Sequence, residues 1–122
     1  MKEIFLHFQT ALYKIDVSGY HGNGGDGLTG RSYSLNGMPF STPDQDNDNW
    51  FGNLNCASDP GQGAGSGWWF NACLHVNPNG LNHGHAKTGT VASMVWYRWG
   101  RKWESLKTIS MAIRRADIPG DI

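Results

Sequence analysis

The pair of cysteines, Cys56 and Cys73, limits how this protein can fold more than any other part of the sequence. They flank a glycine-rich stretch that ends in the apolar run 68–70, and no other cysteine is present in the 122 residues. A disulfide across a loop of this length would stabilise the fold by roughly 3 kcal/mol. The alternative is a pair of buried free thiols. The absence of a Cys-x-x-Cys pair argues against a zinc site or a redox dithiol.

The overall composition favours a loop-rich globule with an aromatic core. The chain has 17 glycines and 6 tryptophans, and its 10 basic and 10 acidic residues balance. Without a basic patch, nucleic acid is not an expected partner. No apolar run approaches the roughly 20 residues that span a bilayer, so membrane insertion is not expected either.

Alternating apolar residues predict several extended segments. Residues 4–17 are expected to be extended, and two further strands are expected at 91–99 and 106–114 with a turn at 100–102. No pattern predicts a helix longer than a turn or two.

The six tryptophans divide into two predicted groups. Core packing is expected for Trp68, Trp69, Trp96 and Trp99, because a sequence with so much coil needs aromatic burial. Partial exposure is expected for Trp50 and Trp103.

Three carboxylates stand at alternate positions of a polar loop, at Asp44, Asp46 and Asp48. Such spacing lets a short loop surround one Ca²⁺ with side-chain oxygens, while backbone carbonyls complete the coordination. The loop is not an EF-hand, because Asn49 replaces the glycine and Asn55 replaces the glutamate that an EF-hand requires. The alternative is a solvated acidic turn, since Asp and Asn are common in turns.

Taken together, the motifs resemble the C-terminal part of a fibrinogen-like domain, the globular domain of fibrinogen chains, ficolins, tachylectins, angiopoietins and tenascins. The resemblance covers residues from about 13 to 114. Its motifs are the segments 13–20, 25–26, 36–48, 55–57, 67–73, 79–80, 95–99, 105–107 and 111–114. It implies a mixed α+β fold, rich in β and coil, with a short antiparallel sheet, an irregular calcium- and ligand-binding subdomain and few short helices. The sequence, residues 1–122, is then one partial domain without the N-terminal subdomain.

The resemblance also implies a metal site. Asp46 and Asp48 would supply carboxylates to Ca²⁺, and Trp50 and Gly52 would supply backbone carbonyls. Asp44 would be solvated or would lie outside the coordination sphere.

A ligand site beside a Cys56–Cys73 disulfide is implied as well. Relatives have a cis peptide bond before the second cysteine, which corresponds here to Ala72–Cys73, and the ligand-binding residues would be Ala72, Cys73, Leu74 and His75. In the lectin branch this pocket takes an acetyl group between aromatic side chains. Here Leu74 stands where many relatives have His, and the flanking loops, 58–66 and 75–94, contain no Tyr, Phe or Trp.

These features lead to two competing functions. The first is an extracellular, calcium-binding recognition module that binds acetylated or other glycans in innate immunity. The second is a protein-interaction module of the angiopoietin or tenascin type, which binds a receptor or matrix ligand and no sugar. Catalysis is not expected, because no nucleophile motif such as Gly-x-Ser-x-Gly occurs.

The resemblance also bears on where the protein acts and how it assembles. It suggests part of a secreted protein, although no signal peptide is recognisable in this sequence. Strand edges left open in a half-domain would favour homo-oligomers.

Overall fold

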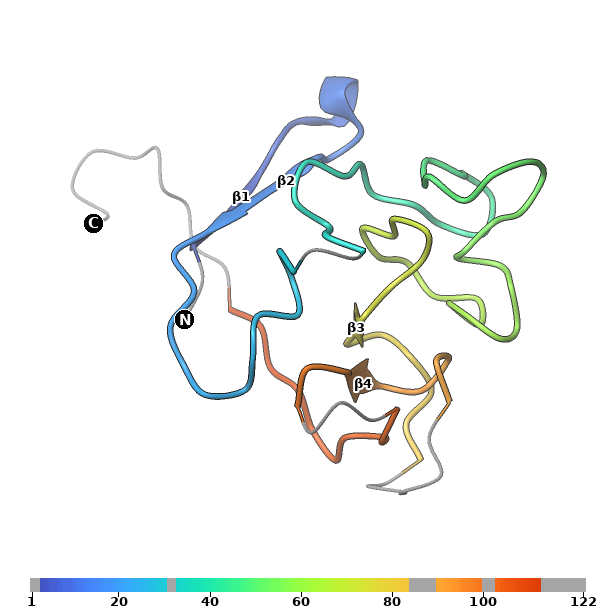
Figure 1. Cartoon of the computed structure of the whole chain (residues 1–122). Helices are drawn as coiled ribbons and strands as arrows, with labels where there is room; N and C mark the ends of the chain where they lie inside the picture. Colours follow the sequence, from blue (N-terminus) through green and yellow to red (C-terminus); the bar gives the residue numbers. More distant parts are fainter. Residues whose placement is uncertain (1–2, 31–32, 84–89, 100–102, 113–122) are drawn as a thin grey trace, which may run out of the picture.

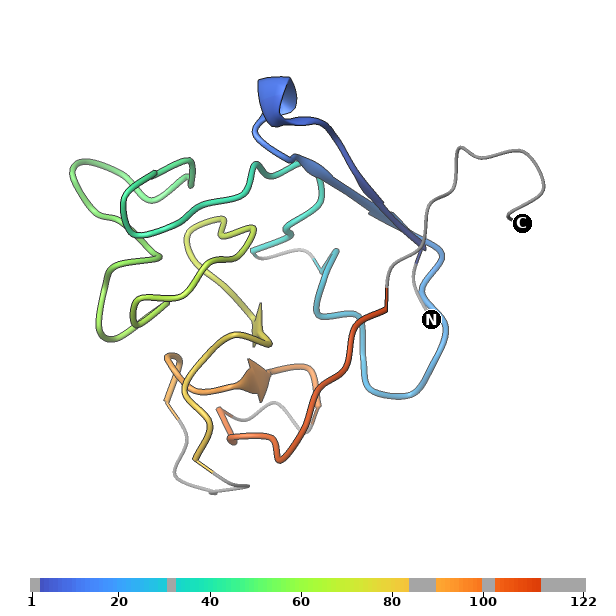
Figure 2. The same ribbon diagram turned by 180° about the vertical axis from the view of Figure 1, so that it is seen from behind.

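The computed structural model describes residues 3–30, 33–83, 90–99 and 103–112. These residues form two small antiparallel sheets and very little helix, as the predicted fold class requires. Figure 1 shows the blue β1–β2 hairpin and the β3–β4 pair in different halves of the molecule, and Figure 2 shows the same arrangement from behind. The elements are β1 (Glu3–Leu6), the 3-10 turn η1 (Gln9–Ala11), β2 (Ile15–Ser18), β3 (Val76–Asn77) and β4 (Val95–Trp96).

The hairpin confirms part of the predicted extended segment. Strand β1 pairs with β2 in a register that places Glu3 opposite Ser18, and Ile15 and Val17 turn into the core while the residues between and after them are exposed. The prediction of an extended backbone through 7–14 is wrong. Backbone N–H groups there donate to carbonyls three residues earlier, from Ala11 to Phe8 at 3.0 Å among others, so the backbone coils instead of continuing the strand.

The predicted C-terminal strand pair is also wrong. Only residues 95–96 of the first segment form a strand, and they pair with β3. Within 106–112 no strand forms, because most side chains there are exposed, including Met111, so the alternating pattern buries no face. Residues 100–102, the predicted turn, and 113–114 lie outside the described part of the protein.

The hydrophobic core is centred on the segment that precedes the second cysteine. Trp68 and Trp69 are buried and Phe70 is fully buried, as predicted. Trp96 is half-buried and donates its indole N–H to the Gly25 carbonyl at 2.9 Å. Trp99, predicted to be core, is 54% exposed, because the backbone turns after β4 and leaves its ring at the surface beside Gly24.

The glycine-rich loop folds tightly against the first cysteine. The N–H of Gly63 donates to the Cys56 carbonyl at 2.8 Å. A Cβ at Gly63 would lie 2.6 Å from that carbonyl oxygen, so no larger residue fits at this position. The loop therefore packs on its own backbone, which holds Cys56 in place.

Candidate functional site

The acidic loop is organised by short-range hydrogen bonds from backbone to carboxylate. One oxygen of Asp46 accepts from the Asp48 N–H at 3.2 Å, and one oxygen of Asp48 accepts from the Trp50 N–H at 2.8 Å. The other oxygen of Asp48 accepts from the Cys56 N–H at 2.8 Å. The loop is thus attached directly to the first cysteine.

The two predicted metal carboxylates differ in environment. Asp46 is exposed and Asp48 is half-buried. Burial raises the pKa of Asp48, and the neighbouring Asp46 raises it further, against the lowering effect of the two backbone N–H donors. Negative charge is therefore concentrated where water can compensate for it only in part.

The carbonyl oxygens of Trp50 and Gly52 and the carboxylate of Asp44 differ in their hydrogen bonding. Among the described residues, no hydrogen bond reaches the carbonyl oxygens of Trp50 and Gly52. Asp44 is exposed and accepts from the Thr42 hydroxyl at 2.6 Å, and this hydrogen bond lowers the pKa of Asp44. No three side chains of His, Cys, Asp or Glu form a metal-binding group in the part of the protein that the structure describes. A hard cation here would thus depend on backbone carbonyls besides two carboxylates, which is a donor set that suits Ca²⁺.

The predicted disulfide is confirmed. Cys56 and Cys73 are joined, with their Cα atoms 5.6 Å apart. The expected cis peptide bond between Ala72 and Cys73 is also present.

The four predicted ligand residues form a tight turn at this cis bond. Cys73 and Leu74 are buried, while Ala72 and His75 are partly exposed. Within the described residues, the backbone N–H groups of Cys73 and Leu74 donate no hydrogen bond, and such groups are expensive to leave unpaired when buried. The turn therefore contains two backbone N–H groups that have no acceptor among the described residues.

Aromatic side chains surround His75, although none comes from the loops that flank the cysteines in sequence. Its imidazole stacks on Tyr97 at 5.0 Å between ring centroids and meets the edge of Tyr33 at 4.8 Å. The ring centroid of Trp103 lies 4.5 Å from that of Tyr97 and 6.0 Å from that of His75. We call His75, Tyr33, Tyr97 and Trp103 the His75 cluster. Sequence reasoning missed it, because nothing in the local spacing brings residues 33, 75, 97 and 103 together.

The electrostatics of His75 follow from this packing. Burial lowers the pKa of the His75 imidazole, and the positive charge of Arg98 lowers it further. Its Nδ1 atom is buried without a hydrogen-bond partner. The neutral ring therefore dominates near pH 7.

Asn71 connects the acidic loop to the turn, and its role was not anticipated. Its backbone carbonyl accepts from the Asn49 N–H at 3.0 Å, and its own N–H donates to the Cys73 carbonyl at 2.8 Å. Its side chain accepts from the Asn49 amide at 3.1 Å and donates to the Ser34 carbonyl at 2.6 Å. One residue thus joins the acidic loop, the cis turn and the loop that carries Tyr33.

Several known proteins are similar to this one. Rat fibrinogen-like protein 1 is 38% identical over 117 residues, which is 89% of this chain and 35% of the relative. Chicken fibrinogen beta chain is 35% identical over 130 residues, which is 89% of this chain and 27% of the relative. The sequence therefore spans about a third of the length of these curated relatives.

Solved structures agree with the sequence relatives. The fibrinogen-like globe domain of human ANGPTL2 matches with a TM-score of 0.68 and 35% identity over 85% of this chain and 44% of that one. Lamprey fibrin D-dimer, in complex with the peptide ligand Gly-His-Arg-Pro-amide, matches with a TM-score of 0.68 and 25% identity over 98% of this chain and 44% of that one. No helix in the described part of the protein has the length and apolar character needed to cross a membrane.

The family model of the C-terminal globular domain of fibrinogen beta and gamma chains matches residues 3–116, nearly the whole sequence. That match agrees with the small antiparallel sheets, the Cys56–Cys73 disulfide and the solved relatives. The chain therefore belongs to the fibrinogen C-terminal domain family.

Proposed function

We propose that this protein is an extracellular recognition module that binds Ca²⁺ in the acidic loop and an acetyl-bearing glycan at the Ala72–His75 turn. The observation that carries the proposal is the turn itself, where the N–H groups of Cys73 and Leu74 are unpaired among the described residues and aromatic rings lie at the adjacent His75. The disulfide supports an extracellular location, because such bonds persist in oxidising compartments.

The residues of the acidic loop fit the calcium ion that the family implies. Asp46 and Asp48 would hold it through carboxylate oxygens, and Trp50 and Gly52 through carbonyl oxygens that accept no other hydrogen bond within the described residues. The ion would supply positive charge that offsets the repulsion between the two carboxylates. Because Asp48 also accepts from the Cys56 N–H, an ion at the loop would stabilise the base of the ligand-binding turn.

The turn suits a small acyl group. An unpaired N–H donates readily to an acyl carbonyl oxygen. The aromatic rings of the His75 cluster offer an apolar surface for the methyl group, and the neutral imidazole adds no charge to it. N-acetylated sugars present this pair of features.

A protein-interaction function is the second candidate, and Leu74 favours it. This residue is apolar and buried at a position where many relatives have His. Lamprey fibrin D-dimer, a structural relative, is complexed with a peptide ligand. In this alternative the turn would bind a peptide backbone carbonyl.

The decisive experiment measures binding of the oxidised protein to N-acetylglucosamine, glucose and Gly-His-Arg-Pro-amide by calorimetry, in calcium and in chelator. We expect calcium-dependent binding of N-acetylglucosamine that added glucose, which lacks the acetyl group, does not displace. Tyr97→Ala should weaken it about tenfold through lost aromatic contact. Trp99→Ala is the matched control, because this ring is exposed and lies outside the His75 cluster. Binding of the peptide alone would establish the second candidate instead.

A further inference from the structure

A second concave site lies away from the cis turn, between η1 and the segment that enters the acidic loop. It is a cavity of about 190 Å³. An apolar cavity of about 150 Å³ holds a benzene molecule in another protein, so this one has room for a single six-membered ring. It is lined by the apolar or aromatic residues Leu12, Tyr13 and Phe40 and by the polar residues Gln9, Thr42, Gln45 and Asn47.

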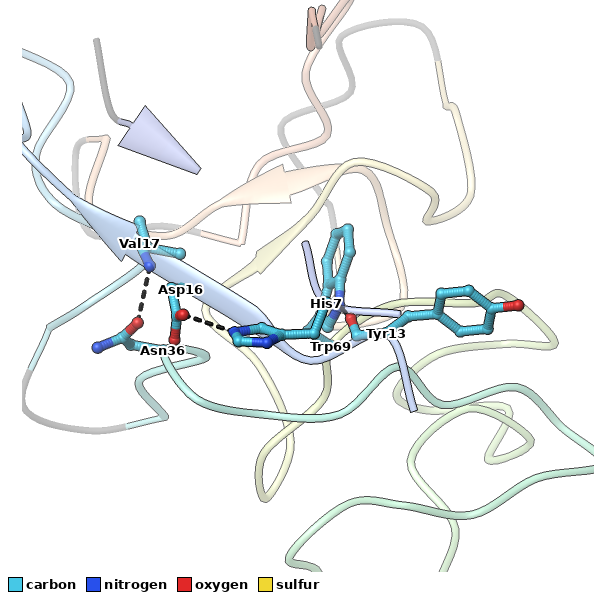
Figure 3. A network of polar contacts seen from close by, with 6 residues as sticks. All are labelled: His7, Tyr13, Asp16, Val17, Asn36 and Trp69. Atoms are coloured by element: carbon cyan, nitrogen blue, oxygen red, sulfur yellow. Dashed lines mark hydrogen bonds and ion pairs between the residues drawn. The ribbon is translucent and has the colours of Figure 1, made fainter. Parts of the chain in front are cut away.

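One wall of the cavity is held in an unusual backbone conformation. Leu12 and Tyr13 both have φ of 54°, in the left-handed region that residues with a side chain seldom adopt. Their carbonyls are fixed by the Phe40 N–H at 2.9 Å and by the Trp69 indole N–H at 2.8 Å. Figure 3 shows the Tyr13 ring pointing away from Trp69. Tyr13 is consequently 50% exposed at the cavity instead of packing into the core.

The polar residues that line the cavity carry uncharged groups that both donate and accept hydrogen bonds. Gln9, Gln45 and Asn47 carry amides, and Thr42 carries a hydroxyl. The Asn47 amide is oriented by the hydrogen bond that its Nδ2 donates to the Phe40 carbonyl at 2.8 Å. A charged ligand would find no counter-charge in this lining. A wholly apolar ligand would displace water from these groups without replacing its hydrogen bonds.

The cavity and the acidic loop share one short segment of the sequence. Gln45 and Asn47 line the cavity, and they alternate in sequence with Asp44, Asp46 and Asp48. None of the four turn residues, Ala72 to His75, lines it. The cavity is therefore a separate site, and its existence does not depend on whether the turn binds an acetyl group.

From these observations we propose that the cavity binds one uncharged pyranose unit of a glycan. The ring carbons would contact Tyr13 and Phe40, and the hydroxyl groups would exchange hydrogen bonds with Gln45 and Asn47. Such a ligand matches the size of the cavity, the absence of charge in its lining and its mixture of apolar and polar residues.

The test is NMR titration of the isotope-labelled, oxidised protein with methyl α-D-mannopyranoside and methyl β-D-galactopyranoside, in calcium throughout. These probes lack an acetyl group, so they should not occupy the turn. We expect backbone amide shifts at Tyr13, Gln45 and Asn47. Tyr13→Ala should weaken binding about tenfold. Phe8→Ala is the matched control, because Phe8 is 84% exposed and does not line the cavity.

Other results would overturn the proposal in distinguishable ways. Absence of shifts with either glycoside, or shifts confined to Leu74 and His75, would reject the cavity as a sugar site. Shifts at Gln45 and Asn47 with N-acetylphenylalaninamide alone would make it a peptide pocket. If Tyr13→Ala fails to fold, the exposed Gln45→Ala replaces it, and unchanged glycoside affinity in that variant would equally reject the proposal. Loss of acetyl-sugar binding in Tyr97→Ala tests only the turn.

Discussion

The acidic loop and the cis turn are neighbours joined through Asn71, but they are built in different ways. In the loop, Asp46 and Asp48 each accept from an N–H two residues further along the sequence. At the turn, His75 lies against Tyr33 and Tyr97, which are distant in sequence. A site made of adjacent residues can persist when packing loosens, whereas a site made of distant residues exists only while the core holds them together.

Removal of the disulfide should have the largest effect, and it should impair the turn more than the acidic loop. The double variant Cys56→Ser with Cys73→Ser should lose about 3 kcal/mol of unfolding free energy, because the unfolded state regains the entropy of an open loop. We expect ligand binding at the turn to disappear and calcium binding to weaken less. Urea unfolding and calcium titration measure the two effects. An unchanged unfolding midpoint would contradict the stabilising role of the bond.

Asp48→Asn should remove the calcium response while leaving the turn folded. At a calcium concentration 100 times the dissociation constant, binding should add about 2.7 kcal/mol to the stability of the wild-type protein. We expect this gain to vanish in Asp48→Asn and to remain in Asp44→Asn, because Asp44 interacts only with Thr42 among the contacts described. Thermal unfolding with and without calcium measures it. Equal calcium shifts in both variants would exclude the proposed coordination.

Asn71→Ala should weaken the connection between the loop and the turn. The variant loses its two side-chain hydrogen bonds, to Asn49 and Ser34, so we expect a loss of about 2 kcal/mol in stability. The backbone hydrogen bonds of residue 71 and the Asp48–Cys56 hydrogen bond remain, so ligand binding at the turn should respond less to calcium without losing the response. Paired titrations of calcium and acetyl sugar test this. Asn53→Ala, at an exposed asparagine, is the control, and an undiminished calcium response in Asn71→Ala would rule out the proposed connection.

Acidification should lower the stability of the protein by the smallest amount of these changes, through His75 at the turn. Because burial and Arg98 lower the pKa of His75 in the folded state, the unfolded state binds more protons below about pH 6.5. Stability should therefore decline as the pH falls through that value. His75→Gln should flatten this decline, because it removes the group whose pKa is lowered in the folded state. Melting temperatures across this pH range provide the measurement, and identical profiles for His75→Gln and wild type would refute the assignment.

Prediction from sequence succeeded where neighbouring residues decide the outcome. The segment 68–70 is buried as its composition indicated, and Ile15 and Val17 face the core as their alternation indicated. It failed where a local pattern met a different tertiary environment. The alternation in 106–112 matches a strand, yet no partner strand lies beside it among the described residues and Met111 remains exposed.

In the candidate site, too, some features were predicted from the sequence, and those assembled from distant segments were not. The cysteine pairing and the cis bond followed from the family resemblance and are present. The loops beside the cysteines contain no Tyr, Phe or Trp that could surround the turn. The fold supplies them from residues 33, 97 and 103, and no spacing rule connects those positions.

By itself, the sequence determined the chemistry that is available: alternating carboxylates, one cysteine pair, a compact aromatic run and glycines where backbones must meet. These properties depend on residue identity and on covalent neighbours. Only the tertiary structure decided which of these groups come together, including the His75 cluster, the connection through Asn71 and the cavity at Tyr13. The physical reason is that burial of a common core brings distant segments into contact, and contacts between distant residues leave no local pattern in the sequence.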